Sequence, residues 1–176
     1  MPEITMADKL HRTEFLGREF LTWLFFRSCR DRENITVDGA TYRVHFERMM
    51  TLDGENPATE MSTIKVDEPS QSDEVLLSLK LGKKVSRCRM IITVDGVDYT
   101  TGFDSATLSF KSLKMPAVKG SELADIVDEK TELTNAVEDA LHTLFVHFVR
   151  LRLDSDTWDR EAGEIADWIM TQDVLG

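Results

Sequence analysis

The strongest functional signal in this sequence is a basic cluster, Lys80-Leu-Gly-Lys-Lys-Val-Ser-Arg-Cys-Arg89. It carries five positive charges and no acidic residue. Side chains alternate along a strand, so two arginines that are two residues apart share one face. If that face is exposed, the cluster can neutralise phosphates. The candidate DNA-contacting residues are Lys80, Lys83, Lys84, Arg87 and Arg89. In the competing interpretation, these charges pair with acidic helices or solvate an outer sheet face.

Other kinds of chemistry have weaker support in the sequence. Cys29 and Cys88 lie beside arginines, which lower a thiol pKa, but a small apolar role is the commoner use of a cysteine in a helix or strand. His142 and His147 are five residues apart, which places them on different faces of a helix and does not suit a shared metal. The sequence contains neither GxSxG nor a Gly-rich phosphate loop. We expect no enzymatic activity, no bound metal and no cofactor.

A metal-dependent nuclease is the alternative enzyme, because several carboxylates beside a lysine can hold Mg²⁺. Asp95, Asp98 and Asp104 could form such a set with Lys83 or Lys84. Asp95 is already explained by a hairpin turn, however. We therefore place this hypothesis below the DNA-contact hypothesis.

The formal net charge of −11 is concentrated near the C-terminus, since residues 1–119 carry a net charge of −1 and residues 120–176 carry −10. This asymmetry leaves room for a basic surface in the first part of the chain. It also supports a second hypothesis, an interaction module whose acidic helices bind a basic, nucleic-acid-processing protein. No signal-peptide pattern or membrane-length apolar run is visible. We expect a cytoplasmic protein without membrane contact, associated with the nucleoid if it binds DNA.

The most apolar and aromatic stretch of the sequence is expected to form a helix over about Glu14–Arg30. Its apolar residues extend beyond a single face, so several sides of the helix need cover. One interpretation is a buried core helix. The other is a homodimer interface, for which Phe20, Trp23 and Phe25 are the candidate residues.

Two eight-residue segments agree at six positions, Ile35-Thr-Val-Asp-Gly-Ala-Thr-Tyr42 and Ile92-Thr-Val-Asp-Gly-Val-Asp-Tyr99. Asp-Gly between β-branched residues predicts a hairpin with a type I′ turn. A helix precedes each hairpin and a further strand follows it, over 59–66 and 107–113. A duplicated α-β-β-β unit is one interpretation. Convergence of good hairpins on the same turn residues is the other.

The C-terminal part is expected to be a helical pair. Leu133, Val137, Leu144 and Phe148 follow a spacing of three to four residues, and Asp154 breaks this helix and caps the next. Ser72 and Gly82 bound a short middle helix. The expected fold is α+β, with antiparallel hairpins, a buried N-terminal helix and this C-terminal pair. Residues 1–12 are expected to be a polar lead-in and 13–172 a single domain, of which 120–172 is the acidic helical part.

Three segments resemble the RdgC-like family of recombination-associated bacterial proteins: Phe15-Leu-Gly-Arg-Glu-Phe-Leu-Thr-Trp-Leu-Phe-Phe-Arg-Ser28, Leu79-Lys-Leu-Gly-Lys-Lys-Val85 and Ser112-Leu-Lys-Met-Pro116. The resemblance covers most of residues 14–170 and matches the C-terminal half of the family, whose members are about twice as long. It implies a non-catalytic protein that binds DNA without sequence preference, forms a dimer and restrains recombination. The only contact position that it transfers is the turn Gly82-Lys83-Lys84.

Overall fold

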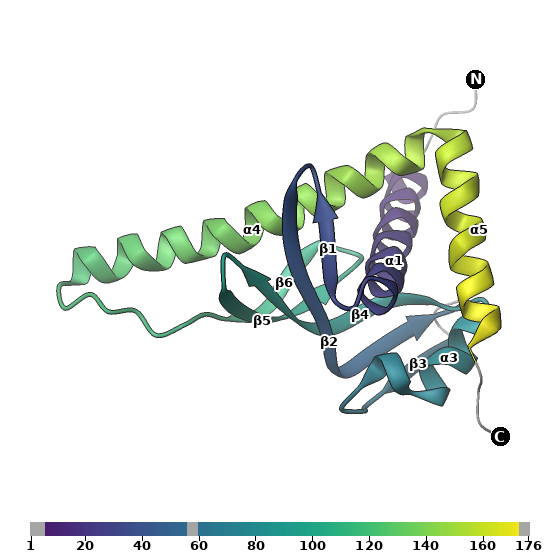
Figure 1. Cartoon of the computed structure of the whole chain (residues 1–176), viewed down its shortest axis with the longest axis horizontal. Helices are drawn as coiled ribbons and strands as arrows, with labels where there is room; N and C mark the ends of the chain where they lie inside the picture. Colours follow the sequence, from purple (N-terminus) through teal and green to yellow (C-terminus); the bar gives the residue numbers. More distant parts are fainter. Residues whose placement is uncertain (1–5, 56–59, 173–176) are drawn as a thin grey trace.

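The computed structural model describes residues 6–55 and 60–172. These form an α+β fold, as predicted (Figure 1). The helices are α1 (Met6–Arg30), α3 (Asp73–Lys80), α4 (Leu123–Leu153) and α5 (Ser155–Thr171), with a 3₁₀ helix η1 (Pro69–Gln71). The strands are β1 (Asn34–Val37), β2 (Ala40–Asp53), β3 (Met61–Ile64), β4 (Lys84–Val94), β5 (Val97–Asp104) and β6 (Ser109–Lys114).

All described strands belong to one antiparallel sheet with the order β1-β2-β4-β5-β6, and β3 pairs with β2. Both predicted hairpins are confirmed. Their turns place Asp38 and Gly39 at φ 50° and 84°, and Asp95 and Gly96 at φ 50° and 79°. A type I′ turn needs positive φ at both central residues, which explains the repeated Asp-Gly.

The order α-β-β-β occurs twice along the chain, but the two sets of strands are paired differently. Arg43 of β2 pairs with Asn34 of β1 and with Thr93 of β4, while Met50 pairs with Ile64 of β3 and with Cys88 of β4. Both β1 and β3 therefore lie on the edge of β2 that faces away from β4. In the second set, β4 and β6 flank β5 on opposite edges. The repeated order agrees with a duplication, whereas the strand arrangement is not repeated.

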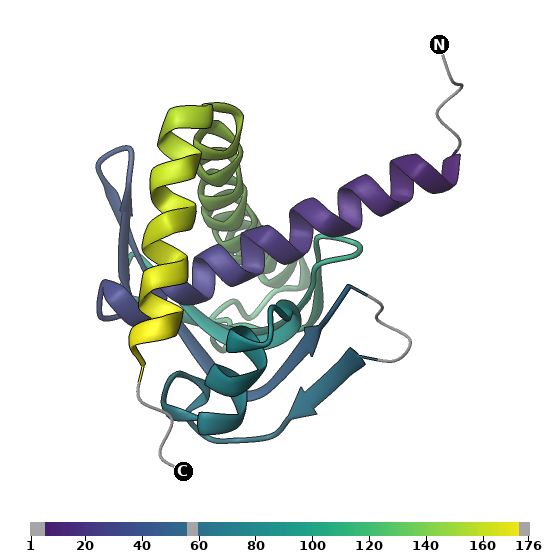
Figure 2. The same ribbon diagram turned by 90° about the vertical axis from the view of Figure 1, so that its right-hand side faces the viewer.

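Helices α1, α3 and α4 pack against the sheet, and α5 packs mainly against these three helices (Figure 2). Helix α1 already begins at Met6, so the structure replaces the expected polar lead-in with helix from that residue onward. Phe20, Trp23 and Phe25, the candidate interface residues, are at most 1% exposed. Because they are buried within this chain, they do not form the exposed homodimer surface that was one of the two expectations. The alternative expectation, a core helix, describes them.

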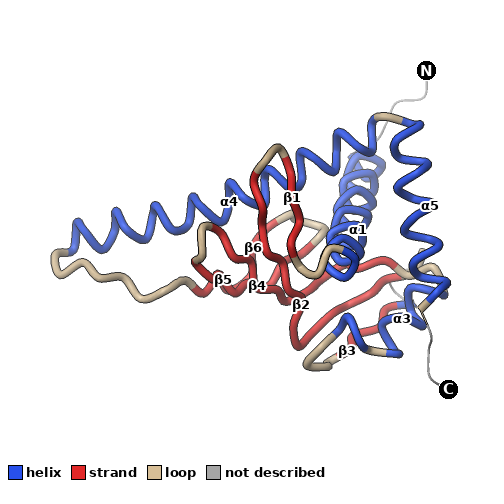
Figure 3. The backbone as a smooth tube through the Cα atoms, in the orientation of Figure 1, coloured by secondary structure: helices blue, strands red, loops and turns tan. Residues whose placement is uncertain are grey.

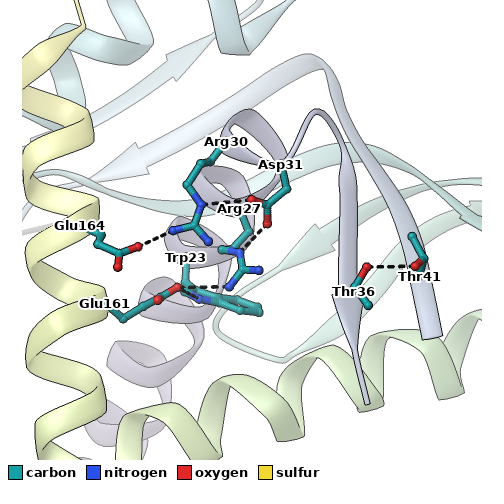
Figure 4. Close-up of polar contacts among 8 residues, drawn as sticks. All are labelled: Trp23, Arg27, Arg30, Asp31, Thr36, Thr41, Glu161 and Glu164. Atoms are coloured by element: carbon teal, nitrogen blue, oxygen red, sulfur yellow. Dashed lines mark hydrogen bonds and ion pairs between the residues drawn. The ribbon is translucent and has the colours of Figure 1, made fainter. Parts of the chain in front are cut away.

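The C-terminal helical pair is confirmed, and a buried carboxylate fixes its second member to α1 (Figure 4). Trp23 Nε1 donates a hydrogen bond of 2.9 Å to Glu161 Oε1, and Arg27 lies 3.5 Å from the same oxygen. Asp154 caps α5 by accepting from the backbone N–H of Thr157 at 2.9 Å. Glu161 thus satisfies an indole N–H that water cannot reach.

Gly17 allows α1 to lie directly against the turn between β5 and β6. A Cβ atom at this position would lie 2.1 Å from the backbone oxygen of Ser105. Only glycine fits so close an approach without a shift of one element. This contact fixes where the β5–β6 turn sits beneath the helices.

Candidate functional site

The outer face of the sheet, opposite α1, carries a row of basic residues. Buried residues of β4 alternate with Arg87 and Arg89, which point away from the helices. The register places Arg89 opposite Gly102 of β5, and Gly102 opposite Lys111 of β6. Because facing residues of paired strands project to the same side, Lys111 joins the arginines on this face.

A second lysine reaches the same face through an irregularity in β6. Lys114 pairs with Thr100, which itself pairs with Ile91 on the outer side of β4. In a regular strand, residues three apart project to opposite faces. Here Ser112 has φ 64° and the register shifts between the two pairs, so both lysines face outward. We call Arg87, Arg89, Lys111 and Lys114 the basic row.

The two arginines of the basic row are already in ion pairs with neighbouring strands. Arg87 Nε lies 3.2 Å from Asp104 Oδ2, and Arg89 Nε lies 2.8 Å from Glu47 Oε1. The Arg87 side chain nevertheless remains 61% exposed. The Arg87–Asp104 pair is exposed, and exposed pairs are weak, typically about 0–1 kcal/mol, so a phosphate can compete for the Arg87 guanidinium.

The three lysines of the basic cluster do not lie beside its two arginines. Lys80 Nζ donates to the backbone oxygen of Gln172 at 2.6 Å, and Lys83 Nζ donates to Ser62 Oγ of β3 at 2.7 Å. Lys84 Nζ lies 3.4 Å from Glu19 of α1. The structure therefore divides the basic cluster into two parts. Arg87 and Arg89 face outward, while the lysines contact β3, α1 and the residue that follows α5.

Arg18, Arg27 and Arg30 of α1 do not add to the outer face either. Arg18 donates to the backbone oxygen of Gly54 at 3.2 Å. Arg27 pairs with Asp31 at 2.7 Å, and Arg30 pairs with Asp31 at 3.1 Å and with Glu164 (Figure 4). Arg27 and Arg30 thus join α1 to the loop that follows it and to α5, and Arg18 joins α1 to the residue that follows β2.

Acidic residues gather on the part of α4 that lies beyond the sheet. The N-terminal half of α4 extends beyond the sheet, and the loop after β6 returns alongside it (Figures 1 and 3). We call residues 121–139 the acidic arm; it contains seven carboxylates and one lysine. Among the described residues, only Glu129 of these carboxylates has a side-chain hydrogen bond, from the backbone N–H groups of Lys119 and Gly120. The other six are exposed: Glu122, Asp125, Asp128, Glu132, Glu138 and Asp139.

Both thiols are unsuited to nucleophilic chemistry. Burial, and then the charge of Glu33, raise the pKa of Cys29 to about 12, and burial also raises the pKa of Cys88. These directions agree with the small apolar role favoured by the sequence, and not with the alternative of thiols activated by neighbouring arginines. The thiols remain protonated at neutral pH, and a protonated thiol is a poor nucleophile.

Within residues 6–55 and 60–172, no three His, Cys, Asp or Glu side chains are grouped so as to hold a metal ion. The same part of the chain has no helix that is long and apolar enough to cross a membrane. No known family model matches the chain, and comparison with curated proteins and with solved structures also gives no match.

Proposed function

We propose that this protein is a non-enzymatic nucleic-acid-binding protein that holds DNA against the outer face of its sheet without reading its sequence. The observation that carries this proposal is the basic row, which brings four cations from β4 and β6 onto one face around Gly102. Cations of this kind contact phosphates, and phosphate contacts position a duplex but do not specify bases. The resemblance to RdgC-like proteins supports a role in modulating recombination.

Much of the chain's negative charge lies away from this face, because the acidic arm extends beyond the sheet and α5 packs against the helices (Figures 1 and 2). Salt also limits the reach of these charges, because the Debye length is about 10 Å at 0.1 M ionic strength. The outer face therefore presents its own charges to a ligand. Binding weakens steeply as salt rises, as it does for other phosphate-dominated interfaces.

A salt series with fluorescently labelled duplex DNA tests the proposal through the slope of log affinity against log salt concentration. Four phosphate contacts predict a slope of about −3 to −4. The double substitution Arg87→Glu with Lys111→Glu should abolish retention of DNA at low salt. Repetition with single-stranded DNA shows which form this face prefers.

The matched control is Lys130→Glu with Arg160→Glu, which changes the net charge equally but lies on α4 and α5. This control should bind DNA nearly as well as the unchanged protein. Equal loss in both double variants would show that net charge, and not the basic row, governs binding. Absence of DNA retention by the unchanged protein at low salt would refute the proposal outright.

A further inference from the structure

An aromatic groove of about 580 Å³ lies where α4 crosses the β5–β6 hairpin. Its lining consists of Phe20, Phe103, Leu108, Ser109, Phe110, Glu138, Leu141, His142 and Phe145. Phe20 contacts Phe145 edge-to-face at a centroid distance of 5.2 Å, and Phe103 contacts Phe110 at 6.0 Å. The inner wall is thus apolar and preformed, and its volume lies within the usual range for ligand pockets.

The rim of this groove belongs to the acidic arm. Glu138 and His142 are exposed on α4 and lie one helical turn apart, and Asp139, the residue after Glu138, is also exposed. Toward the N-terminus, Asn135, Thr131 and Asp128 continue the same helix face at spacings of three to four residues. A ligand held in the groove therefore lies beside the exposed carboxylates of Glu138 and Asp139, and a longer ligand reaches Asp128 further along the arm. None of these three carboxylates has an ion pair with another described residue.

We propose that the groove and the acidic arm form a docking site for a basic segment of another protein, which inserts one large apolar side chain. The aromatic wall supplies burial for that side chain, as anchors at interfaces require. The carboxylates of the arm complement lysines and arginines on either side of it. This site lies across the sheet from the basic row and does not depend on DNA binding.

A second copy of the chain fits this site less well than a basic partner. The groove's rim and the arm are negative, and the C-terminal part from residue 120 onward has a net charge of −10. Two arms facing each other would bring like charges together, which disfavours that pairing. Charge complementarity therefore selects a segment rich in lysine and arginine.

A dye-labelled peptide with one tryptophan between lysines and arginines is the probe, and fluorescence anisotropy measures its affinity for the full chain. Replacing Glu138 with Lys should weaken binding about fivefold or more, because an attractive rim charge becomes repulsive. Asp167→Lys, on the exposed side of α5, is the matched control and should change the affinity less than twofold. A peptide with serine in place of tryptophan should bind at least about tenfold more weakly.

Each possible result decides the matter. Lack of binding by the tryptophan peptide, equal binding by the serine peptide, or equal weakening by Glu138→Lys and Asp167→Lys would overturn the proposal. Light scattering tests whether a second copy of this chain occupies the groove. Self-association that Glu138→Lys removes would assign the groove to a second copy instead. Because the basic row is unchanged in these variants, DNA retention measured alongside separates failure of this site from failure of the proposed function.

Discussion

Replacing Glu161 with alanine should cost about 1–4 kcal/mol of unfolding free energy. Trp23 is fully buried, and Glu161 is the acceptor for its Nε1–H group at 2.9 Å. A buried donor left without a partner costs about 1–3 kcal/mol. The charge contact with Arg27 adds at most about 1 kcal/mol, because Arg27 retains Asp31 at 2.7 Å.

The geometry also predicts an order among related variants. Glu161→Gln keeps an acceptor oxygen for Trp23 and loses only the charge, so it should cost about 1 kcal/mol. Glu164→Ala removes an exposed partner of Arg30 from the same helix and should cost less than about 1 kcal/mol. The loss should therefore be largest for Glu161→Ala, smaller for Glu161→Gln and smallest for Glu164→Ala.

Urea denaturation followed by far-ultraviolet circular dichroism measures these differences, provided that the slope of free energy against urea is the same for each variant. A Glu161→Ala protein as stable as Glu164→Ala would refute the reasoning. It would mean that the indole N–H finds another partner or water after the substitution. Equal losses for Glu161→Ala and Glu161→Gln would instead assign the whole effect to charge.

Three further predictions concern other positions. Gly17→Ala should lower the unfolding free energy measured in urea by about 1–3 kcal/mol, because its Cβ would overlap a backbone oxygen. The Cβ of Gly163→Ala on α5 meets no other atom, so this variant should raise the unfolding free energy by up to about 1 kcal/mol. The opposite order of stabilities would contradict this packing. Burial lowers the pKa of His147, so the folded state binds fewer protons than the unfolded chain, and stability should fall as the pH drops below about 6.5; His147→Gln should flatten that part of the stability curve. Cys29, whose pKa is raised to about 12, should react with a thiol reagent at pH 8 far more slowly than the unfolded chain, and rapid labelling of the folded protein would contradict its burial.

Local signals in the sequence identified the elements well. The Asp-Gly turns at Asp38 and Asp95 and the caps at Ser72 and Asp154 were predicted correctly because each depends on a few adjacent residues. The apolar spacing that predicted α4 likewise needs only one helix. Thus the fold class and the order of elements in residues 13–172 followed from the sequence.

The candidate site could not be assembled in the same way. Lys111 and Lys114 join Arg87 and Arg89 only through the register of three strands and the irregularity at Ser112. No local pattern specifies which strand lies beside which, and three-residue spacing would place the two lysines on opposite faces. The groove was missed for the same reason, since its walls come from α1, α4 and the β5–β6 hairpin.

Because α4 is anchored mainly through its C-terminal half, the length of the acidic arm does not depend on the packing of the core. The fully buried residues of α4 lie between Val137 and Phe148, while the preceding turns contact mainly the returning loop through Glu129 and Thr134. A helix extends by about 5.4 Å per turn. Whole turns could therefore be inserted or deleted before residue 130, with a matched change in the loop, at little cost to the domain. The arm's length is thus a property that substitution of core residues leaves untouched, and selection or engineering can adjust it separately to the spacing of a partner.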